Sequence, residues 1–235
     1  MIGYKIASSD GKRVLVKLRI NSHNTNINRY TIKDKLCAKY RCYHAIVINI
    51  EDEKGNKYSS AFTSMYKEKS LKYILGEEVV EKDYNKDINV VCGEGIHFFL
   101  SKEVALLYGL NNVKNGEYKS WFDDGQLSIH CNYKEGKLKG EYKRWFSNCQ
   151  LQNHCYYKEG KLEEEYKRWW SNGQLQNHCY YKEGKLEGEY KRWWSNGQLE
   201  IHCYYKEGKL EGEYKSWFYN GQLYIHCYYK EGKKE

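Results

Sequence analysis

Histidine and cysteine lie side by side at five positions in the second half of the chain. Both residue types are common ligands of metal ions and common partners in nucleophilic catalysis. The pairs recur every 24 residues, so they are either a repeated chemical site or a repeated structural position. They are His130-Cys131, His154-Cys155, His178-Cys179, His202-Cys203 and His226-Cys227.

A second group of soft ligands lies in the first half of the chain. Cys37, Cys42, Cys92 and His97, with His44 nearby, have spacings that a structural zinc site tolerates. Paired Cys-x-x-Cys knuckles are missing from the sequence, and small free cysteines are commonly just buried. We therefore expect no metal and no other cofactor, with these residues as weak zinc candidates. A Cys–His nucleophile is a further alternative, although the sequence shows no paired acids, phosphate loop or nucleophile elbow.

The second half consists of five consecutive repeats of 24 residues, at 116–139, 140–163, 164–187, 188–211 and 212–235. Most repeats hold two turn signals, Asn-Gly and Glu-Gly, separated by segments rich in Tyr, Trp, Leu and Ile. Asn-Gly is the stronger hairpin signal, because a type I′ turn needs positive φ at both central residues. One repeat is then a hairpin plus a connecting turn. The fold class predicted for residues 116–235 is all-β, a single-layer antiparallel meander of about ten strands.

A two-residue loop at Asn196-Gly197 places Trp194 opposite Leu199. Because side chains alternate between faces, one face collects Tyr190, Arg192, Trp194, Leu199, Ile201, Cys203, Tyr205 and Leu210. The other face collects Glu189, Lys191, Trp193, Glu200, His202 and Tyr204. The His and Cys of each pair thus point to opposite faces and cannot chelate one metal. Cysteines two strands apart lie about 9–10 Å apart, too far for a disulfide, so we expect a buried cysteine column.

These repeats resemble MORN repeats, in the variant of bacterial and large-virus proteins. The shared pattern is G-x-Y-x-x-W/F-x-x-N-G-Q-L followed by Y-Y-K-x-G-K-L-x-G, and it covers all five repeats. Glu164, Cys149 and Lys234 depart from it, and Cys149 occupies a turn position that favours glycine. The resemblance implies a platform for protein partners or for membranes carrying acidic lipids. The bacterial variant is also named as an antitoxin.

Residues 1–115 contain no repeat and predict a small α+β domain of unassigned function. Strands are expected at 12–20, 44–50 and 95–100, a turn at 51–57, and a helix at 101–110 that begins after the N-cap Ser101. The segments 39–52 and 92–108, including the stretch Gly-Ile-His-Phe-Phe, resemble a domain found in proteins of large DNA viruses and phages. That resemblance covers about residues 12–110 and implies a viral setting, but it supplies no mechanism.

The charge and the apolar pattern limit the location of the protein. The chain carries 39 Lys and Arg against 31 Asp and Glu, a formal charge of +8, and the array of repeats is nearly neutral. A bias this mild favours anionic surfaces but identifies neither nucleic acid nor a membrane. No apolar run approaches the roughly 18 residues of a transmembrane helix, and no secretory signal is present. We expect an intracellular protein with reduced thiols, in the host cytoplasm if viral, with peripheral membrane attachment as an alternative.

All seven Trp and most Tyr and Phe lie in residues 116–235. Because exposed aromatic surface usually marks an interaction site, we expect a non-enzymatic binding or scaffold protein. Rings that merely cover a thin sheet are the alternative reading. The expected partner surface comprises Trp121, Trp145, Trp169, Trp193, Trp217, His154, His178 and His202.

Other functions stay open at this point. One is an antitoxin-like inhibitor of a partner protein, and another is an enzyme with its chemistry in residues 1–115 and the repeats as a targeting arm. Binding of nucleic acid ranks lower, because a nearly neutral array offers no strong phosphate footprint.

The last strand, at 222–229, carries Tyr224 where earlier repeats have Ser, Gln or Glu. An open strand edge offers unpaired N–H and C=O groups to another strand. We therefore expect homodimerisation through this carboxy-terminal strand, about a two-fold axis.

Overall fold

The computed structural model of the chain describes residues 1–63, 70–110 and 113–235. Two compact units are distinguished in it. The amino-terminal domain comprises residues 1–110 together with 120–126, and the array comprises the other described residues, 113–119 and 127–235. The boundary expected after residue 115 therefore differs in one respect, since a segment of the first repeat belongs to the amino-terminal domain.

Hydrogen bonds to the backbone of residues 120–126 attach this segment to the rest of the domain. The carbonyl oxygen of Asp123 accepts hydrogen bonds from the Arg29 guanidinium (2.5 Å) and from the N–H of Lys39 (3.2 Å). A Cβ on Gly125 would lie 2.2 Å from the carbonyl oxygen of Asp34, so glycine permits this close approach. The bonds use a main-chain carbonyl, and the repeat pattern therefore gives no signal for them.

The amino-terminal domain is mostly sheet. Eight strands pair in the order β3-β8-β1-β2-β4-β7, with β5 joined to β1 and β6 joined to β5. The elements are β1 (Ile2–Ser9), β2 (Lys12–Arg19), the 3-10 helix η1 (Ser22–Asn24), β3 (Lys39–Cys42), β4 (His44–Glu51), β5 (Ser60–Phe62), β6 (Lys72–Ile74), β7 (Glu78–Val80), β8 (Ile96–Phe99) and α1 (Lys102–Leu107). The expected strands coincide with β2, β4 and β8. The expected helix is shorter than predicted, and the Ser101 hydroxyl caps it by accepting from the N–H of Val104.

The core of this domain lies between the sheet and the segments that cover it. Val16, Leu18, Tyr40 and Phe98 are fully buried in one apolar cluster. Arg41 is also fully buried, and its guanidinium donates hydrogen bonds to the carbonyl oxygens of Val90, Asn85, Asp87 and Glu94. A buried charge is tolerated only where its donors are satisfied, so Arg41 fixes the loop that precedes β8.

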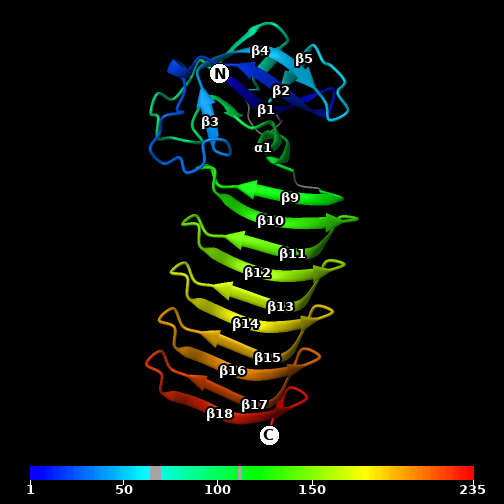
Figure 1. Ribbon diagram of the computed structural model, residues 1–235, viewed down its shortest axis with the longest axis vertical. Helices are drawn as coiled ribbons and strands as arrows, with labels where there is room; N and C mark the ends of the chain where they lie inside the picture. The colour runs from blue at the N-terminus through cyan, green and yellow to red at the C-terminus, as the bar shows by residue number, and fades with distance from the viewer. Residues whose placement is uncertain (64–69, 111–112) are drawn as a thin grey trace. The chain divides into compact units, whose positions relative to one another are not determined.

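The array is an antiparallel meander in which each strand pairs with the next along the chain, as Figure 1 shows for β9 to β18. This confirms the predicted architecture. The strands are β9 (Gly116–Trp121), β10 (Leu127–Lys134), β11 (Lys137–Trp145), β12 (Leu151–Lys158), β13 (Lys161–Trp169), β14 (Leu175–Lys182), β15 (Lys185–Trp193), β16 (Leu199–Lys206), β17 (Lys209–Trp217), β18 (Leu223–Lys230) and β19 (Lys233–Lys234).

The Asn-Gly turn differs from the type I′ turn expected for it. In the Asn196-Gly197 turn only the glycine has positive φ, at 84°. The N–H of Trp194 donates to the carbonyl oxygen of Gln198 (2.8 Å), and the Gly197 N–H donates back to Trp194 (3.0 Å). This is a three-residue loop closed by a glycine bulge. The type I′ turn lies instead at Glu207-Gly208, where both residues have positive φ, 52° and 82°.

The longer loop changes the register beside it. Leu199 lies opposite Trp193 rather than the predicted Trp194, and a bulge follows. Glu200 is the additional residue there, and Oε2 of its carboxylate lies 2.7 Å from Nε of the Arg192 guanidinium in an ion pair. Glu200 therefore shares the face of Arg192 and Leu199 shares the face of Trp193, so the predicted faces of these two residues were wrong. Farther from the turn the register is as predicted.

Candidate functional site

One face of the array, here called the His face, bears His130, His154, His178, His202 and His226. In the fourth repeat the Glu189 carboxylate accepts hydrogen bonds from the Lys191 ammonium (2.7 Å) and from Nε2 of His202 (2.9 Å). Lys191 lies directly opposite His202 across β15 and β16. Because a carboxylate can only accept, Nε2 of His202 carries a proton. The same cluster forms at Glu117–Lys119–His130, Glu141–Lys143–His154, Glu165–Lys167–His178 and Glu213–Lys215–His226.

These clusters balance their own charge. The hydrogen bond from Lys191 is the largest influence on the pKa of Glu189 and lowers it. Burial opposes this effect, and the bond from His202 lowers the pKa by a smaller amount. At neutral pH each carboxylate is therefore ionised beside an ammonium group. The row of clusters presents compensated ion pairs rather than a block of one sign.

A tyrosine packs on the histidine of four repeats. The rings of His202 and Tyr204 lie 5.3 Å apart, and Tyr204 is 39% exposed. The same contact occurs at His154–Tyr156, His178–Tyr180 and His226–Tyr228. This tyrosine column was not among the residues predicted for the partner surface. The signal was present, because a residue two positions after a histidine in a strand points to the same face.

The tryptophans expected on the partner surface are less accessible than Tyr180, Tyr204 and Tyr228. Trp145, Trp169, Trp193 and Trp217 are half-buried. Trp121 is different, since it packs against the apolar cluster formed by Leu15, Phe99, Val104 and Ala105 in the amino-terminal domain. Trp121 therefore does not belong to the surface with the other four.

The opposite face, here called the Cys face, is a packing layer. Cys131, Cys155, Cys179 and Cys203 are 1–2% exposed. Burial raises the pKa of the Cys179 thiol to about 12, so the thiol is neutral and unreactive at physiological pH. Tyrosine pairs flank the column in edge-to-face contacts, with ring centroids 5.8 Å apart at Tyr166–Tyr181. The His and Cys of each pair thus belong to different faces.

The four zinc candidates of the amino-terminal domain do not come together. Cys42 and His97 lie on paired strands at positions that point to opposite faces. Cys42 is buried, whereas the exposed Cys92 donates a hydrogen bond to Oδ2 of Asp123 (3.2 Å). Cys37 is half-buried, and burial and nearby Asp34 raise its pKa to about 11. Within the described residues, no group of three His, Cys, Asp or Glu side chains is placed to hold a metal ion.

A bilayer sets the length that a membrane-spanning helix requires. Among the described residues no helix is long and apolar enough to cross a bilayer, since α1 has six residues.

Comparison with known proteins finds two different families in the two halves of the chain. Residues 1–105 match the model of a family of unknown function (DUF5758). The model of the MORN repeat variant matches residues 114–135, 165–183, 186–207 and 210–231. The repeat at 140–163, which carries Cys149 in place of the turn glycine, is not matched. No curated protein matches the chain. The chain thus combines a domain similar to that family of unknown function with repeats similar to the MORN repeat variant.

Proposed function

We propose that this chain is a non-enzymatic binding protein whose array holds a protein partner on the His face. The observation that supports the proposal most strongly is the tyrosine column on compensated Glu–Lys–His clusters. Tyr180, Tyr204 and Tyr228 are each 39–52% exposed, and tyrosine is enriched where proteins meet. MORN repeats suggest a binding or scaffold role, which agrees with this use of the surface.

Charge balance favours a protein partner over nucleic acid. The Lys of each cluster on the His face donates to the Glu of its own repeat, as Lys167 does to Glu165 at 2.7 Å. Binding to a phosphate backbone draws its affinity from cations that displace counterions. Cations that are already paired with carboxylates contribute little to the affinity gained by displacing counterions. The surface is better matched to a partner that offers apolar and hydrogen-bonding groups.

The test uses the full chain as bait with chemical crosslinking in cell extract. The double variant Tyr180→Ala and Tyr204→Ala should lose at least tenfold of the recovered partner, because it removes exposed rings while leaving the strands paired. Tyr30→Ala is the matched control, since Tyr30 is 83% exposed and lies outside the array. Equal recovery by both variants and the wild-type chain would contradict the proposal.

Other occupants of the same face are outcomes of this test. Co-sedimentation with phosphatidylserine vesicles, lost in the tyrosine variant, would replace the protein partner by an acidic membrane. A captured protein whose toxic activity is inhibited on binding would make the chain antitoxin-like. Turnover of any substrate by residues 1–115 would restore the enzyme alternative. The proposed setting is the cytoplasm, that of an infected host if the chain is viral.

A further inference from the structure

One edge of β1 pairs with β2. Two short strands, β8 and β5, pair with the other edge of β1 and leave a gap between them. β2 pairs with β1 along its whole length, from Ile2 to Ser9. On the other edge, β8 pairs at Tyr4 and β5 pairs at Ser8. No described strand pairs with the residues between these two points on that edge. At about 3.3 Å per residue the opening is about 10 Å long, and it forms the floor of a pocket.

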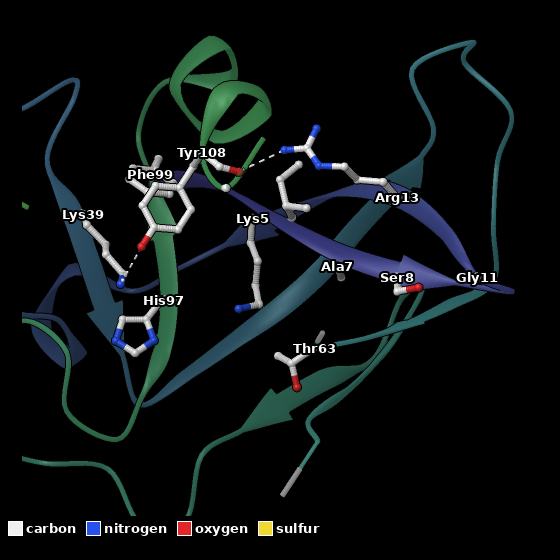
Figure 2. A pocket seen from close by; sticks show the side chains of 12 residues that line it. Lys5, Ala7, Ser8, Gly11, Arg13, Lys39, Thr63, His97, Phe99 and Tyr108 are labelled. Atoms are coloured by element: carbon white, nitrogen blue, oxygen red, sulfur yellow. Dashed lines mark hydrogen bonds between the residues drawn. The ribbon is translucent and has the colours of Figure 1, made fainter. Parts of the chain in front are cut away.

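The pocket over this gap, here called the basic pocket, has a volume of about 490 Å³. That size lies within the range of small-molecule sites, about 300–1,000 Å³. Its lining holds the basic side chains of Lys5, Arg13, Lys39 and His97, and none of its twelve described lining residues is Asp or Glu. Figure 2 shows the Lys5 and Lys39 side chains extending toward His97 from two different strands.

Fixed contacts hold these groups in place. The Lys39 ammonium donates to the Tyr108 hydroxyl at 3.0 Å and lies over the Tyr108 ring. The Nε2 of His97 bonds to the carbonyl oxygen of Val91 at 3.2 Å. Because a carbonyl can only accept, that nitrogen carries the proton. A cationic group held in place, as the Lys39 ammonium is, binds an anion without first having to order a flexible side chain.

Arg13 forms part of the rim. Its guanidinium donates to the carbonyl oxygens of Leu106 (2.6 Å) and Tyr108 (3.0 Å), as the dashed line in Figure 2 marks for Tyr108. This fixes the end of α1 beside the pocket. Phe99 and Tyr108 are in ring contact there, with centroids 4.8 Å apart. The pocket therefore has an aromatic wall next to its basic end.

We propose that the basic pocket binds a phosphomonoester, with the phosphate between Lys5, Lys39 and His97 and the organic group against Phe99 and Tyr108. A phosphate dianion accepts several charge-assisted hydrogen bonds at once, and the hydroxyls of Ser8 and Thr63 line the same pocket. A ligand with a flat or apolar group uses the aromatic wall as well. This site is separate from the His face and does not depend on the partner proposed for it.

The experiment is isothermal titration of the full chain with adenosine monophosphate, and with inorganic phosphate as the smaller probe. Both should bind saturably, and the nucleotide should bind more tightly because it also uses the aromatic wall. The double variant Lys5→Gln and Lys39→Gln should raise the Kd for either probe at least tenfold. Absence of saturable binding by the wild-type chain would overturn the proposal.

The matched control is the double variant Lys82→Gln and Lys86→Gln. These lysines line another hollow of the same domain, together with His23 and Tyr43, and the change in net charge is identical. Their replacement should alter the Kd by less than twofold. A tenfold loss in this control would show that only the overall charge matters, and it would overturn the assignment to the basic pocket.

Circular dichroism would reveal whether the Lys5 and Lys39 double variant fails to fold. In that case a second measurement, made on the wild-type chain, tests the proposal. In the wild-type chain, phosphate or nucleotide should shift the nuclear magnetic resonance signal of His97, assigned with His97→Gln, and leave that of His23 in place. No shift at His97, or equal shifts at both, would contradict the site.

Vesicles containing phosphatidic acid distinguish the source of the phosphomonoester. Co-sedimentation lost in the Lys5 and Lys39 variant indicates a lipid headgroup, and binding of the soluble probes without co-sedimentation indicates a free metabolite.

Discussion

At the scale of single residues, Cys149 shows how much the turn depends on glycine. It has φ of 67°, in the position that Gly173, Gly197 and Gly221 occupy in the later repeats. An L-residue in this conformation costs roughly 1–2 kcal/mol relative to right-handed backbone. The cost is local strain at the turn, since Cys149 is exposed and its side chain is not part of a packed core.

Cys149→Gly should therefore raise the free energy of unfolding by about 0.5–1 kcal/mol, less than the strain because glycine loses more backbone entropy on folding. Urea unfolding of the full chain measures it. The reverse change, Gly197→Cys, is the matched control and should lower stability by a similar amount. If both substitutions changed the free energy of unfolding in the same direction, φ at this position would not determine the stability of the turn.

The Glu–Lys–His clusters make a prediction about pH. The folded-state pKa of Glu189 is lowered, first by the hydrogen bond from Lys191. A carboxyl group with a lowered folded pKa stabilises the fold above its unfolded pKa, about 4.3, and this contribution is lost as pH falls through the folded value. Glu189→Gln should therefore reduce the loss of stability between pH 5 and pH 3. Unfolding midpoints in urea across that range test it, with Glu159→Gln in an exposed turn as the control. An unchanged slope for Glu189→Gln would refute the linkage.

At the scale of elements, a bulge recurs on the second pairing of each of the first four repeats. Where the third repeat meets the fourth, the register shifts between Cys179 and Tyr181 of β14, opposite the segment of β15 that contains Gly188, which has φ of 80°. The same position is Gly140 and Gly212 in other repeats, and Glu164 in the third, at 62°. The glycine that opens the repeat pattern is therefore the bulge residue, which lets the strand resume its alternation.

Gly188→Ala should destabilise the array by about 1–2 kcal/mol, because a Cβ at positive φ is strained even where there is space for it. A Cβ there would meet no atom within 4 Å, so strain alone is measured. Thermal unfolding of the full chain reads out the effect, and Ser195→Ala in the exposed turn of the same repeat should be neutral. Equal melting temperatures for Gly188→Ala and the wild-type chain would contradict the bulge assignment.

The strands and faces of the array follow from the sequence because repetition fixes their period. Turn chemistry was misjudged because Asn-Gly fits two loop types, and the choice between them is made by hydrogen bonds such as that from Trp194 to Gln198. One residue more in the loop reversed the faces of Leu199 and Glu200. Glutamate at positive φ in the other turn is stabilised by the neighbouring repeat, where the Glu187 carboxylate accepts from the Glu207 N–H at 2.7 Å. Such contacts between repeats leave no local signal.

The basic pocket could not be predicted from the sequence for a related reason. Lys5, Lys39 and His97 come from three strands that are far apart along the chain, and no motif links them. They meet because β3 pairs with β8 and β8 pairs with β1. His97 drew attention as a zinc candidate and as part of a Cys–His nucleophile, and none of the cysteines suggested for it lines the pocket. Residues that are brought together by the pairing of distant strands can be grouped into a site only when the register of those strands is known.

At the scale of the whole molecule, exposed apolar side chains of the array gather on the fifth repeat. Phe218, Tyr219, Leu223 and Tyr224 are 49–61% exposed, the last of them the most. In the fourth repeat the counterpart of Tyr224 is Glu200, which is buried at 9%. β19 pairs with β18 only at Tyr229 and Lys230. The surface around Tyr224 is therefore the part of the array best suited to receive a second copy of this chain.

The chain of 235 residues is expected to form a dimer through this surface at micromolar concentration. Light scattering should give twice the mass of the chain, and Tyr224→Gln should return it to the monomer, because glutamine stands at this position in the second and third repeats. Tyr30→Gln replaces a more exposed ring in the amino-terminal domain and should leave the dimer intact. A wild-type chain that scatters as a monomer would contradict the prediction. A dimer that persists in Tyr224→Gln would place the contact elsewhere, and the His face, with its exposed tyrosine column, would be the next surface to test.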